Sequence, residues 1–298
     1  MAILVTGAKG QLGHELVVRW GDHAIPVTRE TFDLSRPAEI GSQVERLQPT
    51  AVVHCAAYTA VDRAEEQADL CRTVNVDAVA ELTRVCQRLE IPLVLVSTDY
   101  VFGLDATRST PYGEDDATGP VNEYGRSKLA AEKIVVEWSR HLIVRTCGLY
   151  GHSPGAVNFV KTMLRLASER PRLRVVDDQH CTPSAASDVA WGIDQLLKLD
   201  ARGIFHVVNE GATTWCEFAR EVLRQSGLAT PIDSIRSEEY PTKAARPRYS
   251  VLSTTKFNAT VGRALPTWRE ALANFLALKG LALERKSERF GSGRPEGA

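Results

Sequence analysis

The sequence has no apolar run long enough to cross a bilayer, and its charges of opposite sign nearly cancel. A membrane-spanning helix needs about 18 or more consecutive apolar residues, and no such run occurs among the 298 residues. The 36 lysines and arginines stand against 37 aspartates and glutamates, which gives a formal charge of -1. Because no global field favours a polyanion or an anionic surface, we expect neither nucleic acid nor a membrane as a partner. An anionic ligand must be bound by local groups.

Cysteine is sparse and unclustered, with 6 residues scattered mostly within apolar segments. No CxxC pair or Cys/His group has the spacing of a zinc site, so we predict no metal site. The opening residues MAILVTGAKG lack the basic start, long apolar stretch and cleavage site of a secretory leader. These absences favour reduced thiols and a cytoplasmic protein.

Short β-branched runs alternate with helical segments through the first half of the chain. This alternation is typical of the α/β class and predicts a Rossmann-type doubly wound parallel sheet. Several runs are apolar on both faces, as strands covered by helices on either side are. The expected elements are AILVT, a helix from Gln11, AIPVT, a helix over 38–47, AVVHCA, a helix over 63–89, LVLVST, a helix that includes 124–138, and LIVRT.

The pattern is looser after residue 150 and predicts a smaller C-terminal α/β lobe. We assign residues 1–150 to a dinucleotide-binding domain and 151–280 to a substrate-binding lobe, some segments of which are free to return to the Rossmann sheet. Residues 281–298 are charged and rich in Gly and Ser, which predicts a flexible tail. In the lobe, helices are expected over 158–168, 187–198, 215–225 and 267–278, and strands over 173–176 and 204–208.

Three glycines, Gly7, Gly10 and Gly13, directly follow the first expected strand and open a helix. Glycine here allows a tight turn and close approach of the backbone to a pyrophosphate, and the helix N-terminus supplies amide donors. The loop therefore predicts a dinucleotide site. Many NAD sites place an acidic residue at the end of the second strand, where this chain has Thr28 and Arg29. A guanidinium there suits a 2′-phosphate, so NADPH is favoured and NADH remains an option.

Tyr124 and Lys128 are four residues apart in an expected helix, which places both side chains on one face. An ammonium beside a phenol favours the phenolate and makes proton transfer feasible near neutral pH. Thr98 ends the fourth expected strand, at the edge where open α/β sheets bind ligands, and is placed to donate to a substrate oxygen. Asn75 is a candidate to hold a water for proton relay. Together with the glycine loop, these residues predict a nicotinamide-dependent oxidoreductase.

Arg246 precedes Pro247 in an irregular segment of the second half. Because a guanidinium matches a phosphate bidentately, Arg246 is a candidate to bind the diphosphate of a nucleotide ligand. The alternative is a surface arginine in a turn. Asp33 is placed to accept a hydrogen bond from an adenine amino group, and the run 177–179 is interpreted as polar loop caps.

The chain resembles the extended short-chain dehydrogenase/reductase superfamily through its TGxxGxxG, strand-end hydroxyl and YxxxK motifs, and more narrowly the dTDP-4-dehydrorhamnose reductase family. The matching stretches run nearly end to end and are GQLG, DLSRP, AAYTAVDRAE, STDYVF, NEYGRSKLAAE, NFVKTMLRLA, VVDDQHCTPS, TTWCEFA and ARPRYSVL.

This resemblance implies NADPH-dependent reduction of the 4-keto group of a dTDP-linked sugar. It implies that Tyr124 protonates the sugar 4-oxygen, that Lys128 lowers the tyrosine pKa and holds the ribose, and that Thr98 orients the carbonyl. Substrate contacts are implied at Thr98 and Asp99. Cofactor contacts are implied at Gly10, Gln11, Leu12, Asp33, Leu34, Ala57, Tyr58, Thr59, Tyr124 and Lys128.

One departure from the family concerns the sugar site. Where the family carries an aromatic residue in RTSWVY, this chain has Gly148 in RTCGLY, so we expect a stacking wall to be missing. A 4,6-dehydratase needs Thr-Asp-Glu at the strand end, and the Thr98-Asp99-Tyr100 run disfavours that activity. Two alternatives stay open: a nucleotide-sugar epimerase of the same superfamily, and a non-catalytic cofactor-binding subunit resembling the methionine adenosyltransferase β subunit. The sequence also leaves open the oligomeric state, a homodimer included, and any Mg2+ requirement.

Overall fold

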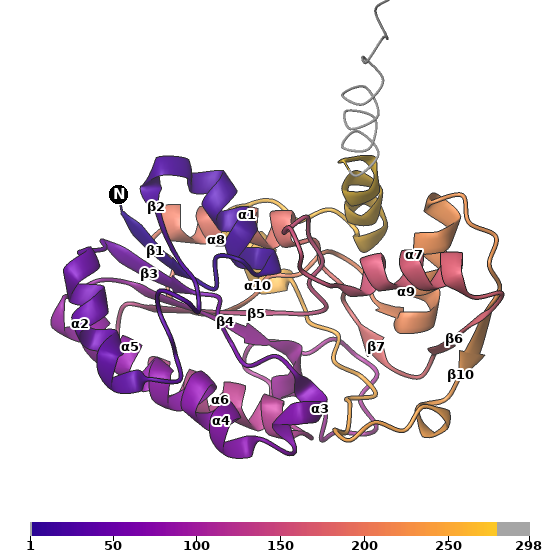
Figure 1. The fold of residues 1–298 in the computed structure, drawn as a ribbon, viewed down its shortest axis with the longest axis horizontal. Coiled ribbons are helices and arrows are strands. Elements are labelled where there is room, and N and C mark those ends of the chain that lie inside the picture. The colour runs from indigo at the N-terminus through magenta and orange to yellow at the C-terminus, as the bar shows by residue number, and fades with distance from the viewer. Residues whose placement is uncertain (1, 279–298) are drawn as a thin grey trace, which may run out of the picture.

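The structure, a computed structural model, describes residues 2–278 and is built around a parallel sheet of six strands (Figure 1). The strand order β2-β1-β3-β4-β5-β8 reverses direction at β1, as in a doubly wound sheet. The predicted Rossmann-type α/β fold is therefore confirmed. The expected tail over 281–298 lies outside the described residues. The strands of this sheet are β1 (Ile3–Thr6), β2 (Ala24–Val27), β3 (Ala51–His54), β4 (Leu93–Thr98), β5 (His141–Thr146) and β8 (Gly203–His206).

Helices cover both faces of the sheet because successive strand residues point to opposite sides. Ile3 and Val5 of β1 pack on the side of α1 and α8, whereas Leu4 packs on the side of α2 and α5. Within the described part of the chain, no helix combines the length and apolar character that a membrane crossing needs. The covering helices are α1 (Gln11–Trp20), α2 (Pro37–Leu47), α5 (Ala78–Arg88), α6 (Glu123–Val135) and α8 (Ala186–Lys198), with short turns η1 (Gly21–His23) and η3 (Asp99–Val101) between elements.

The segment between β3 and α5 differs from expectation, since a single helix over 63–89 is wrong. The chain forms α3 (Val61–Ala64), α4 (Ala68–Arg72), a π-helical turn η2 (Thr73–Asp77) and then α5. Gln67, with φ -123° and ψ 46°, lies outside the helical region and separates α3 from α4. In the π turn, Asn75 is buried and its side-chain oxygen accepts from the backbone N–H of Tyr58 at 2.7 Å. This bond ties the widened turn to the loop after β3.

The second half of the chain forms a lobe with its own core but is not continuous in sequence (Figure 1). β8 pairs with β5, α8 packs on α1, and Phe257 of α10 (Thr255–Val261) joins the core beneath the sheet, so these elements lie with the first domain. The rest packs around Tyr150, Phe218 and Trp268. The lobe elements are α7 (Phe159–Glu169), β6 (Leu173–Val176), β7 (His180–Cys181), β9 (Thr213–Thr214), α9 (Trp215–Gln225), β10 (Ile232–Ile235), η4 (Ser237–Glu239) and a last helix of which 268–278 is described.

Candidate active site

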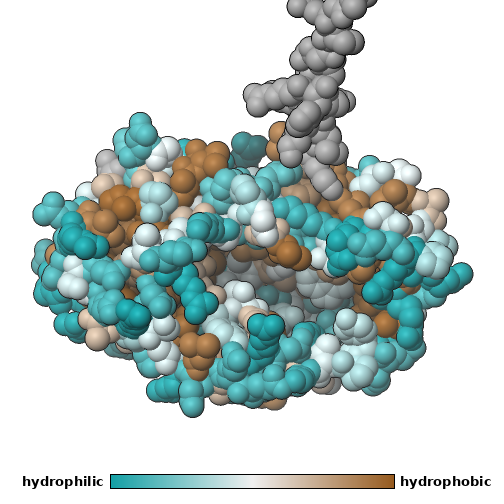
Figure 2. All heavy atoms as spheres, viewed as in Figure 1, coloured by the Kyte–Doolittle hydropathy of each residue, from teal (hydrophilic) through white to brown (hydrophobic). Residues whose placement is uncertain are grey.

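A cavity of about 780 Å³ lies at the carboxyl ends of the central strands, where open α/β sheets bind nucleotides. The molecular surface is hollowed between the two halves (Figure 2). The cavity volume falls within the usual range for cofactor and substrate pockets. Every cofactor position predicted from the sequence lines the cavity, together with Thr98 and Asp99: Gly7, Gly10, Gln11, Leu12, Gly13, Arg29, Asp33, Leu34, Ala57, Tyr58, Thr59, Tyr124 and Lys128.

The glycine loop fits a pyrophosphate. Gly7 has φ +68°, and a Cβ on Gly13 would lie 2.3 Å from the carbonyl oxygen of Gly7, so a larger residue at 13 would push the helix away from the loop. The N-cap Gly10 makes no side-chain capping bond and the first turn of α1 holds no acidic residue. The amide donors and the positive end of the helix dipole are therefore free of side-chain competition for an anion.

The far end of the cavity, where the ribose of a dinucleotide would lie, presents charges of both signs. Arg29 lines it, and so does Glu30, which accepts hydrogen bonds from the Thr28 hydroxyl and, at 3.0 Å, from Lys9. These bonds lower the pKa of Glu30 to about 2. Sequence reasoning missed Glu30 although it lies roughly twenty residues after Gly10, the spacing expected of a ribose-binding acid.

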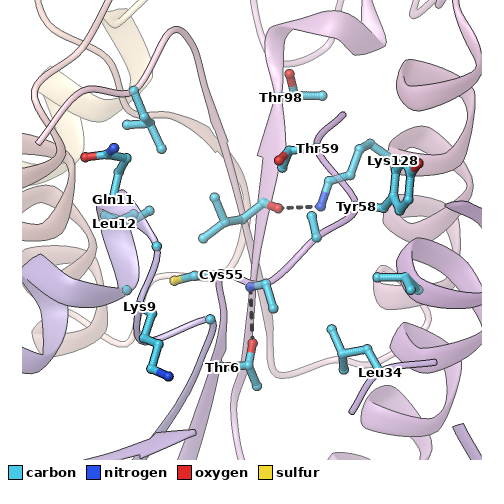
Figure 3. A pocket seen from close by; sticks show the side chains of 18 of the residues that line it. Thr6, Lys9, Gln11, Leu12, Leu34, Cys55, Tyr58, Thr59, Thr98 and Lys128 are labelled. Atoms are coloured by element: carbon cyan, nitrogen blue, oxygen red, sulfur yellow. Dashed lines mark hydrogen bonds between the residues drawn. The ribbon is translucent and has the colours of Figure 1, made fainter. Parts of the chain in front are cut away.

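The three predicted catalytic residues come together on β4 and α6. Tyr124 and Thr98 both line the cavity, and the Thr98 hydroxyl acts on the phenol strongly enough to lower its pKa against the effect of burial. The Lys128 ammonium donates to the carbonyl of Val96 at 2.7 Å, and it points across the end of β4 toward the cavity that Thr98 also lines (Figure 3). Asn122 caps α6 by accepting from the N–H of Gly125 at 2.8 Å, which fixes where the helix begins. The geometry thus joins a phenol, an ammonium and a hydroxyl at one end of the cavity.

The protein alone does not favour the Tyr124 phenolate that we expected. Burial is the largest influence and raises the pKa of Tyr124, while the neighbouring Thr98 side chain opposes this rise. Burial also lowers the pKa of Lys128 to about 8, against the attraction of Glu132. Near neutral pH, Tyr124 therefore carries its proton and Lys128 is largely charged, a combination suited to donating a proton rather than removing one.

Asp99 lies directly behind Thr98 and links the two halves of the molecule. It is 2% exposed, accepts from the Ser250 hydroxyl at 2.6 Å and from the Thr98 hydroxyl at 3.1 Å. Burial raises the pKa of Asp99 to about 6. The hydroxyl of Thr98 is thus oriented by Asp99, which Ser250 of the second half holds in place.

Two residues that the sequence places in the site, Arg246 and Asn75, form hydrogen bonds to other protein groups and do not line the cavity. Arg246 is not among the residues that line the cavity; its guanidinium forms a bidentate pair with Asp62, at 2.8 and 2.9 Å. Asn75 also lies outside the cavity lining, and its amide nitrogen donates to the Tyr58 carbonyl and, at 2.9 Å, to Ser127. With both ends of that amide bonded to protein, Asn75 positions the loop at Tyr58 instead of holding a relay water.

The loop over 177–179 behaves as the loop caps we predicted. Asp178 accepts from the backbone N–H and the hydroxyl of Ser237, and Gln179 donates to the same hydroxyl at 3.0 Å. Asp177 accepts from Thr214 at 2.5 Å. Within residues 2–278, no three His, Cys, Asp or Glu side chains are grouped so as to hold a metal ion.

An aromatic side chain from the lobe lies beside Gly148, where the sequence leads us to expect a stacking wall to be missing. A Cβ on Gly148 would lie 3.0 Å from the indole of Trp215, which lines the cavity and packs against Phe159 at 4.7 Å between ring centroids. Sequence reasoning missed Trp215 because its contact with Gly148 joins the start of α9 to the end of β5. Other lining residues that were not predicted include Lys9, Cys55, Cys147 and Val157.

Comparisons with known proteins agree with this geometry. The family described as "RmlD substrate binding domain" matches residues 1–280. The dTDP-4-dehydrorhamnose reductase of Streptomyces griseus is 40% identical over 295 residues, covering 94% of this chain and 94% of that protein. A solved dTDP-4-dehydrorhamnose reductase from Clostridium acetobutylicum superposes with TM-score 0.89 at 34% identity, covering 94% of this chain and 100% of the other. The Bacillus anthracis enzyme, solved in complex with NADP, gives TM-score 0.88 at 34% identity over 93% of this chain and 99% of the other. The chain therefore belongs to the dTDP-4-dehydrorhamnose reductase family and is an oxidoreductase of the extended short-chain dehydrogenase/reductase type.

Proposed function

We propose that this protein reduces the 4-keto group of dTDP-4-dehydro-L-rhamnose to give dTDP-L-rhamnose, with NADPH as the reductant. The observation that carries the proposal is that Thr98, Tyr124 and Lys128 line one cavity together with the glycine loop. Bound NADPH would supply the hydride. The relatives named above support the substrate, since dTDP-4-dehydrorhamnose reductases match nearly the whole chain.

In this proposal Tyr124 is the proton donor to the sugar 4-oxygen. Its raised pKa keeps the phenol protonated until negative charge develops on that oxygen. Lys128 is 2% exposed, so its charge acts through protein and is weakly screened by water, which stabilises the phenolate that remains. Thr98 lies at the end of β4 to orient the carbonyl oxygen, and its hydroxyl would turn from Asp99 to donate to that oxygen.

We propose that the sugar lies between the end of β4 and the second lobe. Asp99 supplies a polar contact there, and the Trp215 indole supplies the apolar wall that stands in for an aromatic residue at 148. For Arg246 to meet the diphosphate, as its sequence context suggests, its two bonds to Asp62 would have to break. We therefore assign Arg246 to the diphosphate only on the condition that substrate displaces Asp62.

The choice of NADPH over NADH rests on the cations at the ribose end. Arg29 lines that end and Lys9 reaches it from the glycine loop, so a 2′-phosphate would meet two positive side chains. Glu30 is the group that favours NADH, because a carboxylate accepts from ribose hydroxyls and repels a phosphate. The NADP complex of the Bacillus anthracis relative supports NADPH as the first cofactor to test.

The direct test is to incubate the protein with NADPH and dTDP-4-dehydro-L-rhamnose, following NADPH absorbance and separating the sugar nucleotides. We expect equal amounts of NADPH consumed and dTDP-L-rhamnose formed. Conversion of the sugar without net NADPH oxidation would indicate an epimerase instead. NADPH binding with no turnover would indicate a regulatory subunit.

The role of Tyr124 is tested by Tyr124→Phe. General acid catalysis contributes roughly 10²- to 10⁴-fold, so kcat should fall by at least about 100-fold while NADPH binding stays nearly unchanged. Tyr240→Phe is the matched control, because Tyr240 is 60% exposed and does not line the cavity. Unaltered reduction by Tyr124→Phe would show that another group donates the proton.

A further inference from the structure

A buried ion pair lies directly behind the candidate catalytic residues. The side chains of Glu132 on α6 and Arg145 on β5 are each 3% exposed, and they meet at 2.8 Å. The Arg145 Nε also donates to Glu132 Oε1 at 3.1 Å, and the Ser97 hydroxyl of β4 donates to the same oxygen at 2.5 Å. Removing two charges from water is costly unless the hydrogen bonds are well satisfied. Hydrogen bonds from β4 and β5 thus hold the carboxylate of Glu132, which extends from α6.

The position of this pair relates it to Lys128. Tyr124, Lys128 and Glu132 follow one another at intervals of four residues, so they share one face of α6. Ser97 is the residue before Thr98 on β4. Neither Glu132 nor Arg145 lines the cavity, so neither touches a ligand there. Any effect of the pair on the reaction must pass through the residues that do.

Glu132 is the charged neighbour of Lys128 in the described part of the chain. Tyr124, on the same face of α6, carries its proton near neutral pH. The other titratable groups that face Lys128 are His54 at the end of β3, Cys55 after it, and Cys71 on α4. Burial lowers the pKa of His54 to about 3 and raises the pKa of Cys55 to about 12 and that of Cys71 as well, so all three are neutral near pH 7. Among these groups, Glu132 therefore supplies the negative charge that stabilises the Lys128 ammonium.

Arg145 binds the same carboxylate that faces Lys128. Besides Glu132, Arg145 faces the Phe102 ring at 5.1 Å, the carbonyl of Glu114 and the ring of His206. Burial lowers the pKa of His206 to about 3, so this histidine is neutral near pH 7. The three buried charges thus run in the order ammonium, carboxylate, guanidinium, and the carboxylate is shared.

We propose that Glu132 and Arg145 form a positioning pair that sets the charge on Lys128 and fixes the catalytic face of α6 against β4 and β5. The inference rests on the proposed function in one respect, that Lys128 must be protonated during the reaction. Glu132 holds the proton on Lys128, and Arg145 moderates that hold. The two partners therefore act on Lys128 in opposite directions.

Opposite effects of the two partners make the experiment decisive. In Glu132→Gln the amide keeps the shape but leaves two buried cations, so Lys128 should lose its proton at least about one pH unit lower. In Arg145→Met the carboxylate acts on Lys128 alone, so the proton should be lost at higher pH. The double variant Glu132→Gln with Arg145→Met removes both charges, which protects the test if one single variant does not fold, and it should fall between the two.

The measurement is NMR titration of isotope-labelled lysine side chains in the protein without ligand, with the Lys128 signal identified by its absence in Lys128→Arg. The pH dependence of kcat is measured alongside, and its alkaline limb should move in the same directions. Glu45→Gln is the matched control, since Glu45 pairs with Arg88 in an exposed bridge between α2 and α5. It should leave Lys128 and the rate profile unchanged.

Shifts of Lys128 in the same direction in both single variants, or no shift in either, would overturn the inference and leave the pair a purely structural brace. Opposite shifts of Lys128 with an unmoved kcat profile would support the pair's effect on Lys128 and count against Lys128 in the proposed reaction. The two failures are therefore distinguishable.

Discussion

Gly148→Ala tests whether the Trp215 indole is the wall of the sugar site. Gly148 has φ +53°, a region that costs a residue with a Cβ about 1–2 kcal/mol. The new Cβ would also lie 3.0 Å from Trp215 Cη2 and 3.2 Å from Pro183 Cα, closer than ordinary van der Waals contact. Because the Pro183 contact is a backbone atom and cannot yield easily, the indole must move. We expect the KM for the sugar nucleotide to rise several-fold while the KM for NADPH stays unchanged.

Gly262→Ala is the matched control for this experiment. Gly262 has φ +73°, and a Cβ added there would have nothing within 4 Å, so the variant bears the backbone cost without touching the cavity. Each kcal/mol should lower Tm by roughly 2–4 °C in a chain of this size. Both variants should therefore lose stability, with Gly148→Ala losing somewhat more, and only Gly148→Ala should change the sugar-nucleotide KM. Equal KM values in the two variants would refute the assignment of Trp215 as the wall.

Three further predictions concern the cofactor, the diphosphate and Asp99. Arg29→Ala should raise the KM for NADPH far more than that for NADH, and Glu30→Gln should raise the KM for NADH more; equal effects on both cofactors would make these residues rim charges. Arg246→Ala should raise the sugar-nucleotide KM if substrate displaces Asp62, and should lower only thermal stability if the pair is a structural clasp. Asp99→Asn should stabilise the protein above about pH 6, by at most roughly 3 kcal/mol, and have little effect on stability below about pH 4. The sign follows because a raised carboxyl pKa means that the folded state prefers the protonated acid, so the ionised form costs stability as pH rises through that window. Urea unfolding at several pH values checks it.

The first half of the fold was predictable because its signals are local. Each strand of the sheet is a short apolar run, and each face of a strand is covered, so period and length identify the element without knowledge of its partner. The break at Gln67 was not predictable in this way, because the residues on either side form helix well. The π turn that follows is also not visible in the local pattern, because Asn75 there is bonded to the backbone of Tyr58, which lies in the loop after β3.

The second half was harder because its pairings are distant in sequence. β8 pairs with β5 only after the chain has passed through α7, β6, β7 and α8. A local sequence pattern does not show that β8 belongs to the same sheet as β5. The candidate site shows the same division. Spacing in the sequence indicates the glycines and the strand-end hydroxyl, whereas the pairing of Arg246 with Asp62, 184 residues away, cannot be inferred from the sequence.

In the proposed reaction, proton donation and sugar recognition belong to different parts of the chain, and this has a consequence for specificity. Thr98 lies on β4, and Tyr124 and Lys128 lie on α6. The ion pair between Glu132 and Arg145 joins α6 to β5 of the sheet. The groups that reach the sugar side from the lobe lie on other elements: Trp215 begins α9, and Ser250 follows an irregular segment and acts through Asp99. A substitution in those lobe segments can reshape the sugar site without moving the phenol. We therefore expect changes of sugar specificity in this fold to arise mainly around Gly148, Trp215 and Ser250, with the proton donor and its buried counter-charges left in place.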